Sequence, residues 1–181
     1  MDPANHTEAL RTALLDLAAE HFTGPGYHST TLAQIAEAAH CDTAELLALY
    51  PDKVSLAAGL HQRWAEQTAV QVTALDASTV AVRFHRIMWD RLDLLTPYRP
   101  MMAAIFSAAL QPDAVVRVHT AGGYASLKIA FHELVAGASD APRNQLVTHM
   151  GTVLTGFYLV LLLFWLYDRS SQQRAARGLV N

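Results

Sequence analysis

The chain has one cysteine and nine histidines as its most reactive side chains. Cys41 stands beside Asp42, and because a neighbouring carboxylate raises the pKa of a thiol, we expect a small buried turn residue here and no redox switch. No two histidines are three or four residues apart, the spacing that puts two metal ligands on one face of a helix. The sequence also has no glycine-rich phosphate loop and no nucleophile elbow. We therefore expect a protein that is not an enzyme and has no metal or cofactor.

Two pairs of polar residues mark helix starts in the first third of the chain. Thr31 and Gln34 have the spacing of a capping box, in which a hydroxyl caps the first turn while the amide side chain reaches back. Asp42 and Glu45 repeat this spacing after a break. The pairs predict two short helices joined by a tight turn. These helices are expected over 31–39 and 42–49.

The remaining sequence has helical periodicity almost throughout, and no sustained alternating segment predicts a strand. The expected fold class is therefore all-α, with about nine helices: an N-terminal three-helix domain and a larger C-terminal helical bundle. We place the small domain at 1–51 and the larger one at 52–181. An apolar first helix stops at Gly24-Pro25-Gly26, and Asp52 is placed to cap a long fourth helix. Later helices are expected over 80–95, 102–109, from Gln111-Pro112-Asp113 through 134, over 143–168, and as a polar tail or last helix over 169–181.

Three short N-terminal helices, with a tight turn between the second and third, are the plan of a helix-turn-helix domain, whose third helix enters the major groove of DNA. In order and spacing, this part of the chain resembles the TetR family of ligand-responsive transcriptional regulators. The resemblance covers about the first third of the sequence. The matching residues are Leu14-Leu15-Asp16 through Phe22, Gly26-Tyr27, Thr30-Thr31-Leu32, Ile35 to Ala39, Leu46, Tyr50, and Lys53 with Leu56.

The resemblance implies a homodimer that binds double-stranded operator DNA, as a repressor would, and is released by a small ligand. It implies that Lys53 faces a phosphate and that Thr43 lies at the start of the helix that reads the bases. Each DNA-facing position also has a purely structural use, as a helix cap or an exposed site. The DNA-facing residues implied by the resemblance are Thr30, Thr31, Gln34, Thr43, Ala44, Ala48 and Lys53.

Departures from the family pattern bear directly on DNA binding. His40, Cys41 and Asp42 stand where the family usually has glycine, an aliphatic residue and serine, and Thr43 stands where a basic residue is common. Residues 1–60 contain two basic residues and eight acidic ones. Because neutralised phosphates supply most sequence-independent affinity, we expect weak DNA binding with a shallow salt dependence. The alternative is a TetR-like protein that has lost DNA binding and acts through a protein partner or as a ligand-binding protein.

Residues 150–167 form an uncharged stretch near the length of a membrane span. Glycines and threonines dilute its first half, so we expect a helix buried in a subunit interface and no contact with a membrane. We predict that the dimer interface is built chiefly from 143–168. The N-terminus has neither the basic start nor the apolar run of a secretory signal, and a single cysteine does not suggest an oxidising compartment. The expected location is the cytoplasm.

The larger domain is rich in aromatic and methionine side chains, most of which we expect in its core. Ligand pockets also form between the helices of bundles, where a few polar groups fix the orientation of the ligand. The helices that hold the ligand in members of the family offer several such residues here. The candidates for an apolar or aromatic small molecule are His85, Trp89, Met102, Phe106 and Tyr124.

Overall fold

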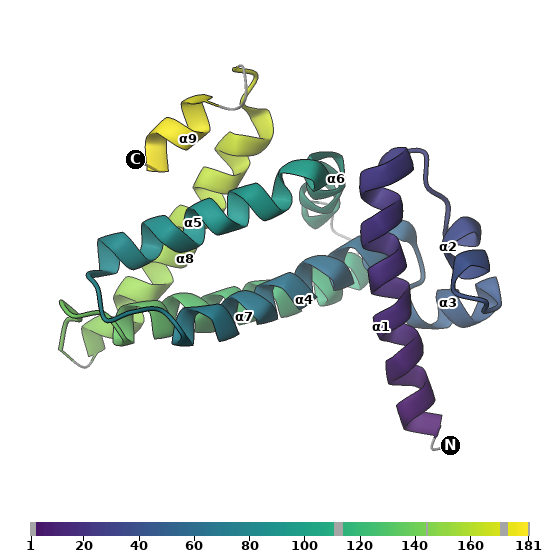
Figure 1. Ribbon diagram of the computed structural model, residues 1–181, viewed down its shortest axis with the longest axis horizontal. Coiled ribbons are helices and arrows are strands. Elements are labelled where there is room, and N and C mark those ends of the chain that lie inside the picture. The colour runs from purple at the N-terminus through teal and green to yellow at the C-terminus, as the bar shows by residue number, and fades with distance from the viewer. Residues whose placement is uncertain (1–2, 111–113, 144, 171–173, 181) are drawn as a thin grey trace. The chain divides into compact units, whose positions relative to one another are not determined.

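The computed structural model of the chain describes residues 3–110, 114–143, 145–170 and 174–180. Within these residues the secondary structure consists of nine α-helices with short π- and 3₁₀-helical turns and no strand, which confirms the expected all-α class (Figure 1). The predicted helix start at 111–113 lies outside the described residues.

The chain divides into two compact units. The first unit comprises Met1–Gln62 and Pro97–Ala121, and the second comprises Arg63–Thr96 and Gly122–Asn181. The long helix α4 passes from one unit into the other after Gln62. The division into functional domains at 1–51 and 52–181 stays a prediction.

The first unit begins with a three-helix head. The α1 helix ends where Phe22–Gly26 form a single π-helical turn around Pro25, close to the stop that the sequence predicts. Figure 1 shows α2 and α3 beside α1, and Leu14, Ile35 and Leu46 fill the space between them with no exposed surface. The helices of this unit are α1 (Pro3–His21), α2 (Leu32–Ala38), α3 (Thr43–Leu49), the start of α4 (Lys53–Thr73), α6 (Arg99–Ala109) and the start of α7 (Ala114–Ala136).

Both predicted capping boxes form at the starts of α2 and α3. The amide of Gln34 donates to Oγ1 of Thr31 at 3.2 Å, and the amide of Thr31 donates to Oε1 of Gln34 at 2.8 Å. Asp42 and Glu45 form the same reciprocal pair at α3. These local bonds satisfy amides that lack partners in the first turn, so each seven-residue helix has a defined start.

The second unit is a helical bundle with an aromatic core. Phe131 lies between Phe84 and Tyr158, with ring centroids 5.6 Å and 5.5 Å away. Tyr158 and Trp165 are fully buried on the inner side of the last long helix. The elements of this unit are the remainder of α4, α5 (Val80–Leu95), the remainder of α7, α8 (Gln145–Tyr167) and α9 (Arg174–Val180).

Helix α8 contains no Asp, Glu, Lys or Arg and has a mean hydropathy of 1.8 over its most apolar window. By length and composition alone it is the one helix among the described residues that could cross a membrane, a test that the core helix of a soluble protein also passes. Its buried side contains Gly151, Thr155 and Tyr158, so it packs within the unit through small and aromatic residues.

Candidate functional site

The turn between α2 and α3 closes with a left-handed residue. The amide of His40 donates to the carbonyl of Glu37, and the amide of Cys41 donates to the carbonyl of Ala36, both at 3.1 Å. This is the Schellman pattern, and its central residue, His40, has φ of 53°. Glycine adopts this conformation without strain, whereas a residue with a Cβ does so at a cost. Both hydrogen bonds form with His40 at this position, so the turn keeps its geometry although the residue is not glycine.

The outer side of α3 carries small and apolar side chains. Thr43, Ala44 and Ala48 are all exposed, as expected for a helix that contacts a ligand through this side. Leu47 lies among them and is 41% exposed, so the face also includes one large apolar side chain. The α3 face, defined by these four residues, has one hydroxyl and no positive charge.

The residues expected around α2 have two different environments. Thr31 and Gln34 are exposed at the start of the helix. The side-chain oxygen of Gln34 completes the cap, while its side-chain nitrogen can donate to a ligand. Thr30 is 1% exposed, and its hydroxyl bonds the carbonyls of His21 and Gly26 at 3.0 and 2.9 Å. The buried Thr30 therefore links the segment before α2 to the π-helical turn through its hydroxyl.

Negative charge stands at the N-terminal turn of α3. Oε2 of Glu45 accepts a 3.0 Å hydrogen bond from the amide of Asp42, which holds two carboxylates beside one another. The pKa of the half-buried Cys41 thiol is raised above its ordinary value. Burial is the largest cause, and the negative charges of Glu45 and Asp42 add to it. The expected direction of this pKa shift is confirmed.

The two basic residues of the first sixty, Arg11 in the head and Lys53 at the start of α4, both interact with groups of this same segment. Nζ of Lys53 lies 2.9 Å from the carbonyl oxygen of Tyr27 and 3.0 Å from that of Thr30, and 4.7 Å from the centroid of the Tyr27 ring. Arg11 lies 3.9 Å from a carboxylate oxygen of Glu8, and its guanidinium is 5.8 Å from the ring centroid of Tyr50. Acidic side chains therefore dominate the charge that the head presents to a ligand.

Comparison with solved structures places this arrangement in a known fold. The TetR transcriptional regulator from Nitrosomonas europaea ATCC 19718 matches with a TM-score of 0.65 and 18% identity, over 95% of this chain and 94% of that one. The chain has the TetR fold. A structure from Shewanella sp. PV-4 that is described as a TetR family transcription regulator matches at 18% identity over 94% and 95% of the two chains, with a TM-score of 0.49. No family model and no curated protein matches the sequence, so the likeness holds at the level of the fold.

The five predicted ligand residues fall in both units of the chain. Met102, 1% exposed, and the half-buried Phe106 belong to α6 in the first unit. In the second unit, Nε1 of Trp89 donates to Nε2 of His85 at 2.8 Å, and Tyr124 is 44% exposed. The His85 and Trp89 side chains thus bond each other along α5. That these five residues contact a ligand stays a prediction.

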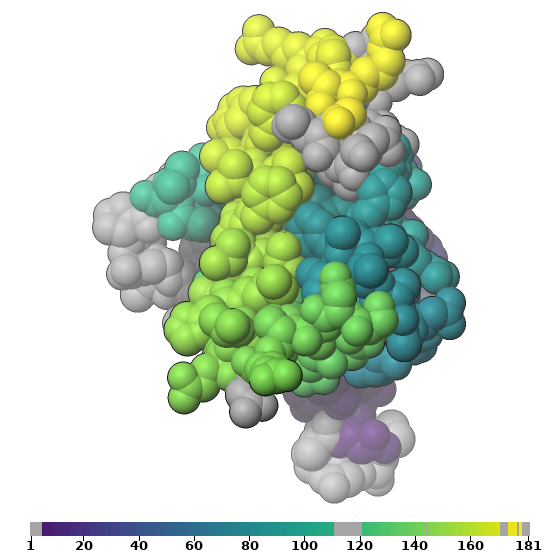
Figure 2. Space-filling view, turned by 90° about the vertical axis from the view of Figure 1, so that its left-hand side faces the viewer, coloured from purple at the N-terminus to yellow at the C-terminus, as the bar shows by residue number. Residues whose placement is uncertain are grey.

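A continuous apolar stripe runs along the outer side of α8. Figure 2 shows this helix, in yellow-green, open to the surface over much of its length. Seven of the eight large exposed apolar residues of α8 alternate in steps of four and three and are 37% to 76% exposed, while Leu163, 42% exposed, lies outside this series. We call this set the α8 stripe: Leu146, Met150, Val153, Phe157, Val160, Phe164 and Tyr167.

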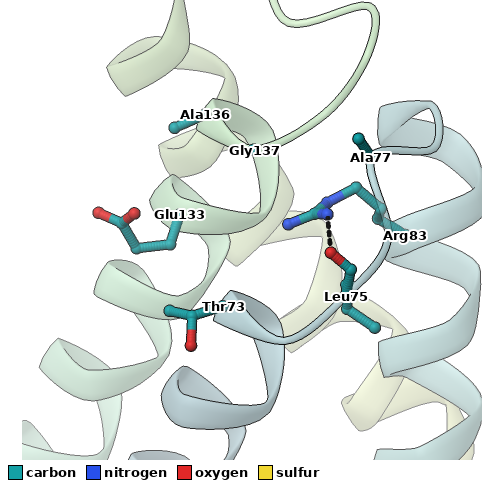
Figure 3. Close-up of a pocket in the computed structure, with 7 residues that line it drawn as sticks. All are labelled: Thr73, Leu75, Ala77, Arg83, Glu133, Ala136 and Gly137. Carbon is teal, nitrogen blue, oxygen red and sulfur yellow. Dashed lines mark hydrogen bonds between the residues drawn. The ribbon is translucent and has the colours of Figure 1, made fainter.

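A hollow of about 360 Å³ lies in the second unit, where α4 and α7 end. Arg83, 3% exposed, reaches it and donates to the carbonyls of Leu134, Leu75, Asp76 and Val72. Figure 3 shows the side chain of Glu133 pointing away from this guanidinium. The arginine thus links the C-terminal ends of α4 and α7. Its lining residues are Thr73, Leu75, Ala77, Arg83, Glu133, Ala136 and Gly137.

A second buried arginine lies in the core of the same unit. Arg91 donates to the hydroxyls of Thr68 at 3.2 Å and Tyr158 at 3.0 Å, which belong to α4 and α8. Neither arginine was expected in the core from its charge. Arg83 and Arg91 are spaced four residues either side of buried Ile87, and this core-facing register is the signal that would have found them.

Proposed function

We propose that this protein is a cytoplasmic, dimeric transcriptional regulator that binds operator DNA through α2 and α3 and is released by a small apolar or aromatic ligand. The observation that carries the proposal is the head itself: two capped helices joined by a Schellman turn, with Thr43, Ala44 and Ala48 exposed on the second. In a helix-turn-helix domain this surface enters the major groove.

The α3 face suits direct contact with bases more than anchoring to phosphates. The Thr43 hydroxyl can hydrogen-bond to a base edge, and Ala44 and Ala48 can contact the methyl group of thymine. Thr31 and Gln34 add a hydroxyl and an amide at the start of α2. Because the head has few cations and many carboxylates, affinity should be modest and depend weakly on salt.

The α8 stripe supports the dimer. Steps of four and three residues keep one side of a helix in register with a neighbouring helix over several turns, as in a coiled coil. Seven exposed apolar side chains form a row along roughly 30 Å of helix, and an exposed apolar patch of this kind is typical of an interaction surface. Contact between the α8 stripes of two copies covers the patch and joins two heads in one molecule, as a two-fold operator requires.

For the ligand, we propose two groups of contact residues, each within one unit: His85, Trp89 and Tyr124 in the second unit, and Met102 and Phe106 in the first. All five offer the aromatic, thioether or imidazole groups that line pockets for apolar molecules. Binding then shifts the position of α4, which starts at Lys53 in the head, and so changes the spacing of the two heads. Such a change in spacing lowers affinity for a fixed operator.

A second candidate function is favoured by Leu47. A leucine that is 41% exposed, with Asp42 and Glu45 nearby on the same helix, suits contact with a basic and apolar protein segment as well as it suits DNA. On this alternative the fold is retained while the head binds a protein partner.

Selection from a library of random DNA duplexes with the full chain tests the main proposal. We expect enrichment of an inverted repeat whose half-sites are about one helical turn apart. The Thr43→Ala variant should enrich a different base at one position of each half-site, since Thr43 is proposed to reach a base edge. Absence of any enriched sequence at low salt would favour the protein-partner alternative.

A further inference from the structure

We propose that Lys53 is a positioning residue that clasps the turn before α2 to the start of α4, in place of the phosphate contact that the family resemblance implies. The proposal concerns the same head as the proposed function and rests on that function only where DNA is added. Lys53, at the start of α4, then stabilises the fold of this segment.

The first support is that the ammonium group of Lys53 already has hydrogen-bond partners within the chain. Lys53 has three N–H donors, and three backbone carbonyl oxygens surround it: Tyr27 at 2.9 Å, Thr30 at 3.0 Å and His28 at 3.5 Å. The ring of Tyr27 also lies within cation–π distance, at 4.7 Å. Two of the three N–H donors therefore have short partners within the chain and the third has a long one, which leaves Nζ little capacity for a phosphate oxygen.

The second support is the need of the turn itself. The segment from Tyr27 to Thr30 lies between the π-helical turn and α2, so its carbonyl oxygens lack the backbone amide donors that a regular helix would provide. Backbone carbonyls near the protein surface require partners from side chains or water. The ammonium group of Lys53 donates to three of these carbonyls. The buried hydroxyl of Thr30 also stabilises the turn, because it bonds the carbonyls of His21 and Gly26.

The third support is the rigidity of the surroundings. Oδ1 of Asp52 caps α4 by accepting a 2.6 Å hydrogen bond from the amide of Ser55, which fixes the first turn that carries Lys53. The Tyr27 ring is 5% exposed and packs edge-on against Phe22 at 5.0 Å. Burial, followed by the charge of Asp52, raises the pKa of Tyr27 to about 12, so the ring keeps its hydroxyl proton. The clasp therefore joins two well-packed segments, and α2 should move together with the first turn of α4.

The chain offers an internal control, because Lys53 and the exposed Lys128 are its only lysines. Trace acetylation of the native protein with acetic anhydride, read at each lysine by mass spectrometry, compares the two amines directly. We expect Lys53 to react at least about ten-fold more slowly than Lys128, and DNA to change the Lys53 rate less than about two-fold. Equal rates at the two lysines without DNA, or strong further protection of Lys53 by DNA, would overturn the clasp. The arm without DNA gives a result even if the protein binds no DNA.

Substitution separates the clasp from a phosphate contact in a second way. Lys53→Met keeps the aliphatic stem and removes the charge, so it should lower Tm by roughly 3–6 °C, whereas Lys128→Met should leave Tm unchanged. The salt slope of DNA binding should stay the same in Lys53→Met, because a phosphate contact contributes about 0.9 to that slope and a clasp contributes none. A slope lower by about one with an unchanged Tm would assign Lys53 to the phosphate. If Lys53→Met does not fold, acetylation of the native chain decides between the two roles.

Discussion

The carboxylate of Glu45 accepts a 3.0 Å hydrogen bond from the amide of Asp42, so two acidic residues face each other at the start of the helix that is proposed to read DNA. The pair favours α3, because negative charge at a helix N-terminus interacts well with the helix dipole. It also repels phosphate. The negative charges of Asp42 and Glu45 therefore stabilise the head but lower its affinity for DNA.

Asp42→Asn tests that conflict. Asparagine keeps the capping oxygen, so stability should change little, while loss of one negative charge should raise DNA affinity roughly two- to five-fold at low salt. Fluorescence anisotropy with a selected duplex measures the change. Asp140→Asn is the matched control, because Asp140 also accepts a backbone hydrogen bond, from Val80, but belongs to the second unit. Equal effects of the two substitutions would remove the special role of Asp42.

His40→Gly should stabilise the chain. The φ of 53° at His40 suits glycine, so the substitution should raise the free energy of unfolding by about 1 kcal/mol. Denaturant unfolding provides the measurement. His40→Ala retains the Cβ and should give no gain, and an equal gain from alanine would mean that loss of the imidazole, and not the backbone, is responsible.

Gly151→Ala and Gly156→Ala should have opposite effects within the same helix. A Cβ at Gly151 would lie 2.9 Å from Cα of His132, where backbone would have to move, so we expect a loss of about 1–3 kcal/mol. A Cβ at Gly156 meets nothing within 4 Å, and alanine in a helix interior should stabilise by about 1 kcal/mol. Thermal unfolding of both variants compares them, and a neutral Gly151→Ala would show that α7 and α8 are not packed this closely.

Val160→Glu should dissociate the proposed dimer. Val160 is 63% exposed in the middle of the α8 stripe, and a symmetric interface would bury the new carboxylate of each copy, so the dissociation constant should rise by roughly 100-fold or more. Sedimentation equilibrium at micromolar concentration measures this. Val70→Glu, at a valine of α4 that is 70% exposed and off the stripe, should leave the mass unchanged. A monomeric wild-type protein would contradict the interface outright.

Local features of this fold could be predicted from the sequence because the residues that make them are close in the chain. Thr31 with Gln34 and Asp42 with Glu45 are three residues apart, and both capping boxes are confirmed. The stop after α1 follows in the same way from Gly24-Pro25-Gly26, although a π-helical turn forms there.

Long-range partners were beyond such prediction. Lys53 meets carbonyls 23 to 26 residues earlier in the chain, and only the folded head brings them together. Arg83 likewise bonds Leu134, 51 residues away, through a backbone oxygen that no side-chain pattern marks. The burial of Thr30 has the same origin, since its hydroxyl partner at His21 belongs to the preceding helix.

The salt dependence of DNA binding tests the central claim most directly. Binding of the wild-type dimer to a selected inverted-repeat duplex should be measured from low to physiological salt. We predict saturable binding by one dimer per duplex, with log K falling against log salt by a slope no steeper than about −4, because few cations are placed to neutralise phosphates. Failure to bind any duplex even at the lowest salt would contradict the account, and the head would then be a surface for a protein partner.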